Sequence, residues 1–151
     1  MKFVPVLFLF TASFLVGADR TEFDRVVDFS VTLDDLDDIV RGERPFDPEK
    51  FVIVEGTVES VMELDGNEES YLVFVELVKG RWIGLEEIGV TKCYVRFAGP
   101  EFSGLLSSRP IGDGSTVSLN SRVLVVGNLG VLEAEDGSPI PVVIAIYARV
   151  L

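Results

Sequence analysis

The sequence contains no histidine and a single cysteine, Cys93, among 151 residues. Without histidine, the chain cannot build a Ser-His-Asp triad, a Cys-His pair or a histidine-ligated zinc, copper or haem site. One cysteine cannot form an intramolecular disulfide, so the fold depends on packing alone. The sequence also lacks repeats, low-complexity tracts and any catalytic motif. These absences argue against an enzyme, and we expect neither a cofactor nor a bound metal.

The first eighteen residues have the layout of a secretory signal peptide. Met1 and Lys2 form a short positive start, residues 3–16 are almost continuously apolar, and Ala18 ends a group of small residues. The apolar run is shorter than the roughly 20 residues that a membrane-spanning helix needs, which favours cleavage after Ala18 over retention as an anchor. We therefore expect a periplasmic or secreted protein without stable membrane insertion.

The composition is strongly acidic, with 13 Lys and Arg against 25 Asp and Glu and a formal net charge of −12. Removal of Lys2 with the signal peptide leaves 12 basic residues against 25 acidic ones, a net charge near −13. Proteins that bind nucleic acid draw much of their affinity from neutralising phosphates. The overall charge therefore argues against nucleic acid as a partner.

Residues 19–48 form an acidic lead-in that carries helix signals. Thr21 and Asp24 favour a short first helix. Thr32, with Asp35 three residues later, has the spacing of a capping box and predicts a second helix that ends near Gly42. The apolar residues of this second helix share one face: Leu33, Leu36, Ile39 and Val40.

Four aspartates gather in the second predicted helix: Asp34, Asp35, Asp37 and Asp38. They lack the alternate-position spacing and the glycine of an EF-hand loop. Acidic residues near the positive end of a helix are favourable without any metal. We therefore expect a solvated helix face here and not a calcium site.

From residue 49 to residue 151 the sequence predicts a β domain. Five runs of β-branched and aromatic residues are expected to form strands, at residues 51–61, 71–78, 91–97, 122–127 and 142–150. Turn signals at Asp65-Gly66 and Asp136-Gly137 separate neighbouring runs. Residues 79–84 are expected to break the second strand, and residues 101–108 are the candidate for a short helix between the third and fourth strands.

The first predicted strand carries Gly56 in its middle. A glycine at this place lets one strand bend sharply and pair with both halves of a closed sheet. Five strands, the first of them bent, with a longer excursion between the third and fourth, match the order of an OB-fold. The predicted fold class is all-β (mainly β): a five-stranded OB-fold-like Greek-key barrel with a short N-terminal helical lead-in.

Several phrases of the sequence resemble a known family. These are VEGTVESV at 54–61, YLVFVEL at 71–77, KCYVRF at 92–97 and SRVLVVGNLG at 121–130. Together they resemble exported bacterial OB-fold proteins of the tRNA-anticodon-binding-like group, over about residues 51–150. The resemblance implies a nucleic-acid-binding ancestor and exported members that act as binding or stress-response proteins. It carries over no catalytic residues.

OB-fold barrels usually bind ligands on the outer face of the second and third strands and on the loops beside it. The candidate ligand-binding residues in that region are Arg81, Trp82, Lys92, Tyr94 and Arg96. An aromatic ring supplies a stacking surface and the cations beside it attract an anionic group. The alternative is that Lys92 and Arg96 only keep an outward face soluble while Trp82 packs a loop onto the barrel.

These observations favour an exported, non-catalytic binding or accessory protein whose ligand is a protein or a small molecule. Three alternatives stay open. The first is a secreted nuclease-like hydrolase that uses carboxylates and a divalent cation, for which Glu76, Arg81 and Arg96 would have to converge. The second is a single-stranded nucleic-acid binder, and the third is a structural envelope protein. The acidic loops also leave open weak binding of a divalent cation.

Cys93 alternates with Val95 and Phe97 in the third predicted strand. Alternate residues of a strand lie on the same face, so Cys93 is expected in the core. It would act there as a small hydrophobic residue and not as a nucleophile, because it has no histidine to activate it.

Overall fold

The structure is a computed structural model that describes residues 20–85, 87–106 and 116–151. The predicted signal peptide, residues 1–18, lies outside the described residues, so cleavage after Ala18 stays a prediction. In the part of the chain that is described, no helix is both long enough and apolar enough to cross a membrane.

The described chain begins with a short helical lead-in and continues into five long strands. The lead-in contains α1 (Arg20–Val26), β1 (Val27–Asp28), the 3-10 turn η1 (Leu33–Asp35) and α2 (Leu36–Val40). The long strands are β2 (Phe51–Asp65), β3 (Leu72–Ile83), β4 (Glu87–Ala98), β5 (Arg122–Glu133) and β6 (Pro139–Val150), with the 3-10 turn η2 (Pro100–Phe102) after β4. Both predicted helical segments of the lead-in and all five predicted strands are present.

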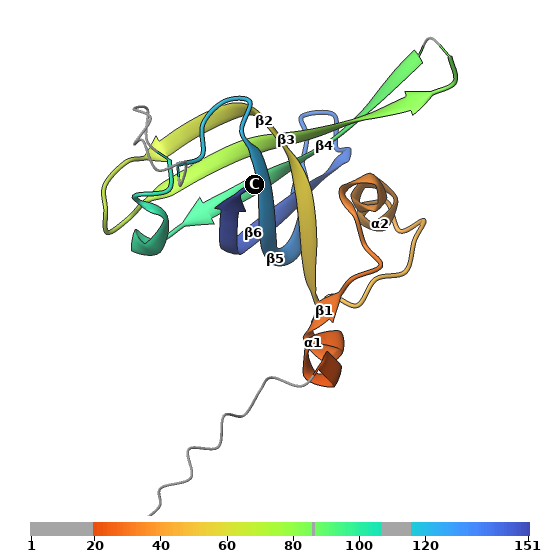
Figure 1. The fold of residues 1–151 in the computed structure, drawn as a ribbon, viewed down its shortest axis with the longest axis horizontal. Helices are drawn as coiled ribbons and strands as arrows, with labels where there is room; N and C mark the ends of the chain where they lie inside the picture. The colour runs from red at the N-terminus through yellow and green to blue at the C-terminus, as the bar shows by residue number, and fades with distance from the viewer. Residues whose placement is uncertain (1–19, 86, 107–115) are drawn as a thin grey trace, which may run out of the picture.

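The five long strands close into a barrel (Figure 1). Strand β2 pairs antiparallel with β3 through its second half and with β5 through its first half. Strand β3 pairs antiparallel with β4, and β5 with β6. The circle is completed by a short parallel pairing of β4 with β6, at residues 94–96 and 142–144. This strand order is that of an OB-fold, which confirms the predicted fold class.

Alternation along each strand separates the core from the surface. The inward positions of the five strands are occupied almost entirely by small aliphatic side chains: Val52, Val54, Val58, Val73, Val75, Leu77, Cys93, Val95, Phe97, Val123, Val125, Val143 and Ala145. Cys93, Val95 and Phe97 lie together on the inner face, as their alternation predicts. β-Branched residues suit a pleated, buried surface, which explains why these runs form strands.

Two glycines allow backbone segments to approach closely inside the barrel wall. A side chain at Gly56 would place its Cβ 3.1 Å from the Val78 carbonyl oxygen and 3.2 Å from Leu33 Cδ1. A Cβ at Gly127 would overlap the Ile144 carbonyl oxygen, at a point where the register of β5 and β6 shifts. At Gly127 any Cβ would push the paired strands apart, whereas at Gly56 a Cβ would be crowded and its neighbours would have to shift slightly.

The lead-in closes one end of the barrel. Leu33 and Leu36 are fully buried in the same core cluster as the strand residues. The other end is filled from the segment after β4, where the ring of Phe102 meets Phe97 edge-on with 5.2 Å between centroids. Of the predicted 101–108 helix, only the turn η2 forms within the described residues, and positions 107 and 108 lie outside them.

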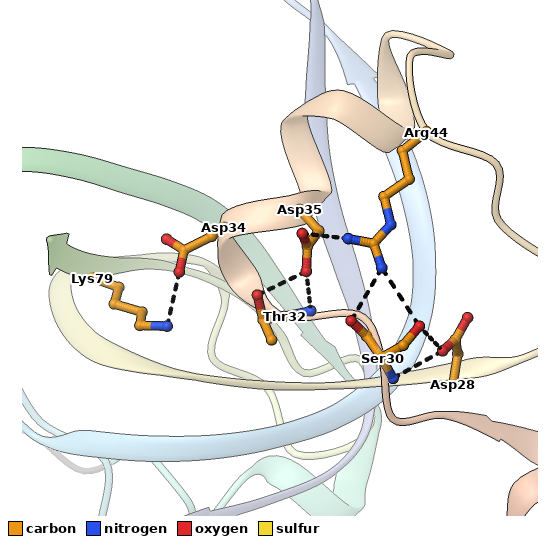
Figure 2. A network of polar contacts seen from close by, with 7 residues as sticks. All are labelled: Asp28, Ser30, Thr32, Asp34, Asp35, Arg44 and Lys79. Atoms are coloured by element: carbon orange, nitrogen blue, oxygen red, sulfur yellow. Dashed lines mark hydrogen bonds and ion pairs between the residues drawn. The ribbon is translucent and has the colours of Figure 1, made fainter.

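Polar contacts hold the lead-in in its folded form (Figure 2). The Asp35 carboxylate accepts a hydrogen bond from the Thr32 backbone N–H at 2.7 Å, as the capping-box spacing predicts. It also accepts one from the Thr32 hydroxyl at 2.8 Å. Asp35 also forms an ion pair with Arg44, and Arg44 donates a hydrogen bond to the Ser30 carbonyl oxygen at 3.1 Å. The connector after α2 is thereby held against the segment between β1 and α2.

Asp34 fastens the lead-in to the barrel. Its carboxylate accepts hydrogen bonds from Lys79 Nζ at 2.9 Å and from Thr91 Oγ1 at 3.0 Å (Figure 2 shows the Lys79 contact). The expectation of a merely solvated aspartate face is therefore wrong for Asp34 and Asp35. Sequence spacing could not reveal this, because the partners of Asp34 lie 45 and 57 residues further along the chain.

Replacing Gly127 with alanine should destabilise the barrel. Because the new Cβ would overlap backbone atoms of β6, the strands must separate, at a cost of about 1–3 kcal/mol. Thermal unfolding followed by circular dichroism should show a melting temperature lower by several degrees for Gly127→Ala. Gly104→Ala is the matched control, because a Cβ there meets no atom within 4 Å. Equal melting temperatures for the two variants would contradict the close approach.

The Asp34 contact should make stability depend on pH in the acidic range. The hydrogen bond from Lys79 lowers the pKa of Asp34 from its ordinary value of 3.8, although burial opposes this change. A carboxyl group whose pKa is lower in the folded state stabilises the fold above its unfolded pKa, and this stabilisation disappears as the pH falls through the folded pKa. Melting temperatures measured from pH 6 down to pH 2.5 should therefore fall less steeply for Asp34→Asn than for the unmodified chain.

The control for this pH series is Glu69→Gln, which removes one charge from the exposed loop between β2 and β3. The Glu69→Gln curve should run parallel to that of the unmodified chain. An Asp34→Asn curve with the same steepness as the control would show that the Lys79 contact does not stabilise the fold.

Candidate functional site

Strands β3 and β4 extend well beyond the barrel as a two-stranded hairpin (Figure 1). The pairing of β2 with β3 ends at Val78, but β3 stays paired with β4 as far as Ile83 and Glu87. We call residues 79–83 and 87–91 the arm. The predicted break at residues 79–84 is therefore wrong: only Gly84, at φ +83°, leaves the strand conformation to begin the turn.

One side of β3 and β4 forms a continuous outer face that runs from the barrel onto the arm. Its cross-strand pairs are Phe74 with Arg96, Glu76 with Tyr94, Val78 with Lys92, Gly80 with Val90, and Trp82 with Ile88. Met62 and Ser60 of β2 extend the first two of these pairs into a third strand. We call these twelve residues the outer face.

Four of the five predicted ligand-binding residues lie on the outer face: Trp82, Lys92, Tyr94 and Arg96. The Trp82 side chain is 72% exposed, so the alternative in which it packs a loop onto the barrel is wrong. Arg81 lies on the opposite side of the arm, because neighbouring residues of a strand point to opposite faces. The structure therefore brings together four of the predicted residues and separates the fifth from them.

A hydrogen-bonded carboxylate lies at the centre of the outer face. Glu76 accepts hydrogen bonds from Lys92 Nζ at 3.0 Å and from Ser60 Oγ at 3.1 Å. The hydrogen bond to Glu76 raises the pKa of Lys92 above its ordinary value, so Lys92 stays charged. Among the described residues, no carboxylate lies within ion-pair distance of Arg96.

The charge of this region differs from that of the whole chain. Strands β3 and β4 carry four basic residues (Lys79, Arg81, Lys92 and Arg96) and two acidic ones (Glu76 and Glu87), although the chain has a net charge of −12. The acidic residues are concentrated elsewhere, above all in the lead-in. The two strands therefore form a locally basic region on an acidic protein.

Sequence reasoning missed the apolar part of the outer face. Met62, Ile88 and Val90 are exposed, and Phe74 is half-buried. The alternation of residues 72–77 carries a signal for Phe74, since it is out of phase with the buried Val73 and Val75. No such signal marks Ile88 and Val90, because they become part of the face only through the pairing of the arm.

The residues required by the nuclease alternative do not converge. Glu76 and Arg96 lie on the outer face, whereas Arg81 lies on the other side of the arm. Among the described residues, no three Cys, Asp or Glu side chains lie close enough together to hold a metal ion. Cys93 lies in the core, and burial raises the pKa of its thiol to about 12. These positions do not favour metal-dependent hydrolysis or thiol chemistry.

A polar groove of about 380 Å³ borders the outer face where β2 leaves β3. It is lined by Glu55, Gly56, Thr57, Val78, Lys79, Gly80 and Arg122. Both of its cations have carboxylate partners, because Arg122 pairs with Glu55 and Lys79 pairs with Asp34. The groove therefore offers an anion less net attraction than Arg96 offers on the outer face.

The chain matches no protein-family model, and no curated protein matches it in sequence. Among solved structures it is similar to a small single-stranded DNA-binding protein from Streptomyces coelicolor, with 13% identity, a TM-score of 0.45 and coverage of 67% of this chain and 91% of that one. It is also similar to the Plasmodium falciparum SSB in complex with single-stranded DNA, with 15% identity, a TM-score of 0.46 and coverage of 72% and 99%. At these identities the similarity concerns the fold.

Two predictions are corrected: the protein or small-molecule ligand and the exclusion of nucleic acid. Both rested on the charge of the whole chain, whereas a ligand on β3 and β4 would meet a locally basic region with exposed aromatic side chains. Of the resemblance to the tRNA-anticodon-binding-like group, the OB-fold itself is supported.

Proposed function

We propose that this protein binds single-stranded nucleic acid along the outer face. The observation that carries the proposal is the position of Trp82 and Tyr94 on one exposed strand face together with Lys92 and Arg96. Aromatic rings beside cations provide stacking surfaces for bases and partners for phosphates, and they do so without reading the sequence. The two similar OB-fold structures, which are single-stranded DNA-binding proteins by name, are consistent with this ligand.

The length of the outer face suits several nucleotides. Trp82 lies opposite Ile88, and Ile88 is six residues from Tyr94 along β4, a separation of roughly 20 Å at strand geometry. Between these positions the face carries two apolar side chains, Val78 and Val90, together with Lys92. OB-fold domains bind about 4–16 nucleotides, and this span lies at the short end of that range.

Stacking should contribute more to affinity than phosphate neutralisation. Lys92 already forms an ion pair with Glu76, whereas Arg96 has no carboxylate partner among the described residues. The face therefore offers a phosphate one paired cation and one unpaired cation. Two phosphate contacts give a slope of about −1.4 for log K against log salt on a single strand. A stacked base contributes about 1–3 kcal/mol. We therefore expect modest affinity with a shallow dependence on salt.

We infer a binding role without catalysis, which is supported by the separation of Arg81 from Glu76 and Arg96. We also infer export, which is supported by the signal-peptide layout of residues 1–18. Mass determination of the protein from an expressing cell tests export directly, because cleavage after Ala18 fixes the new N-terminus at Asp19.

Truncating either aromatic residue should weaken binding. Trp82→Ala and Tyr94→Ala each remove one stacking surface, so the dissociation constant for a fluorescent deoxythymidine oligonucleotide should rise roughly 5- to 150-fold. Fluorescence anisotropy measures this change. The control is Tyr147→Ala, which removes a 53% exposed aromatic residue from β6 at a position paired with β5. If Trp82→Ala and Tyr94→Ala bind as tightly as Tyr147→Ala, the outer face is not the binding surface.

Removing Arg96 should reduce the dependence of binding on salt. Arg96→Ala eliminates one phosphate contact, so the slope of log K against log salt should become shallower by about 0.7. Titrations at 25, 50, 100 and 200 mM salt give this slope. Arg149→Ala is the charge-matched control, since Arg149 pairs with Leu124 of β5 and lies away from β3 and β4. A slope that changes equally in both variants would mean that only the net charge of the protein matters.

A further inference from the structure

The arm is a two-stranded ribbon with two open edges. Beyond Val78, no described strand pairs with β3 on its other side, and β4 pairs with β6 only at residues 94–96. A two-stranded ribbon by itself is at best marginally stable in water, and open edges offer unpaired backbone groups to another strand. The arm also exposes large apolar side chains, Trp82, Ile83, Ile88 and Val90, and Leu85 is exposed in the turn between its strands.

The two edges of the arm differ in charge. The β3 edge, residues 79–83, carries Lys79 and Arg81, so two copies of this edge would bring like charges together. The β4 edge, residues 87–91, has the sequence EIGVT, with one charge, β-branched residues and a glycine at its centre. A short strand of high β propensity and low charge is the kind of edge that pairs with another strand.

We propose that two copies of this chain associate through the β4 edges of their arms. The two strands run antiparallel about a two-fold axis at Gly89. This register places Ile88 opposite the partner's Val90 and Glu87 opposite the partner's Thr91. The contact is isologous, so it closes at two chains and does not continue into a filament.

The outer side of the arm supports this register. Trp82 is paired with Ile88 within one chain, so association would continue the apolar row from Trp82 through Ile88 to the partner's Val90. Ile88 and Val90 are 55% and 64% exposed in the single chain, and cross-strand contact between them would remove apolar surface from water. Two symmetry-related rows of this kind would form across the axis.

The opposite side of the arm is also compatible with the contact. Gly89 has no side chain to obstruct the axis, and Ile83 covers it, since a Cβ at Gly89 would collide with Ile83 Cδ1. In each chain Thr91 is paired with Lys79, so Glu87 of one copy lies two strands from the partner's Lys79. Because Lys79 is already paired with Asp34, this side contributes little attraction, and the contact depends on the outer side of the arm. A second copy is the favoured occupant because the two-fold axis at Gly89 makes the exposed Ile88 and Val90 complementary to each other across two identical edges.

Pairing at the edge leaves the outer face open, so it is compatible with nucleic-acid binding and goes beyond it. Two barrels joined in this way would present their outer faces on one shared sheet. An interface of five residues per chain is at the small end of specific contacts, so the dimer should depend on concentration.

Light scattering coupled to size-exclusion chromatography tests the proposal without nucleic acid. For the purified protein between 5 and 500 μM, the mass should rise from that of one chain toward that of two. Ile88→Lys and Val90→Glu should each raise the dimer dissociation constant at least tenfold, because each places an unpaired charge in the apolar row. The double variant I88K/V90E places opposite charges across the proposed pair and should restore the dimer. Ile146→Lys, which adds the same charge at an exposed site on β6, should leave it unchanged.

A single-chain mass at 500 μM overturns the proposal, as does a dimer that Ile88→Lys leaves intact or a mass above two chains. Failure of the double variant to restore the dimer, with all variants melting as folded barrels in circular dichroism, overturns the antiparallel register at Gly89. Because no oligonucleotide is present, these outcomes are independent of whether the outer face binds nucleic acid.

Discussion

The bend of β2 at Gly56 is the constraint on which the rest of this structure depends. The next residue, Thr57, pairs with both β5 and β3, and a Cβ at Gly56 would lie only 3.1 Å from the Val78 carbonyl oxygen and 3.2 Å from Leu33 Cδ1. Because β2 serves both halves of the sheet, five strands are enough to close the barrel. Closure in turn provides the end cavity in which Leu33 and Leu36 are buried, so the lead-in becomes part of the core.

The same bend determines where the arm begins. Once β2 turns toward β5, β3 has no neighbour on that side beyond Val78, and β3 and β4 continue as a pair. The Asp34 carboxylate binds Lys79 and Thr91 at the point of departure, which fastens the base of the arm to the lead-in. Trp82 and its neighbours therefore extend into solvent on the arm. The base of the arm is held by Asp34, and its two edges have no paired strand among the described residues.

The local charge around the outer face matters more for ligand binding than the net charge of the protein. The protein is acidic overall, yet most of its acidic residues lie outside β3 and β4. At physiological salt, exposed charges interact over a screening length of about 8 Å, so a ligand on the outer face is influenced mainly by the residues of that face. Apolar and aromatic surface with few cations supports binding through stacking, and Glu76 limits the charge that Lys92 offers to a phosphate.

The fold could be predicted from the sequence because its signals are local. Alternation at residues 91–97 identifies the inner face of β4, the Thr32 and Asp35 spacing identifies the turn of the lead-in, and Gly56 identifies the bend. Such patterns record which side of a segment faces the core, and this is decided residue by residue. Lys92, Tyr94 and Arg96 followed from the same alternation, whereas Trp82 was expected in a loop and lies in β3. What only the tertiary structure decided is how far β3 and β4 run, which side of the arm Arg81 occupies, and which segment fills each end of the barrel.

Gly80 and Gly84 gave the appearance of a loop in the sequence, whereas only Gly84 turns the chain and Gly80 is paired within the strand. These features depend on pairings between residues far apart in the chain, and no local periodicity encodes them.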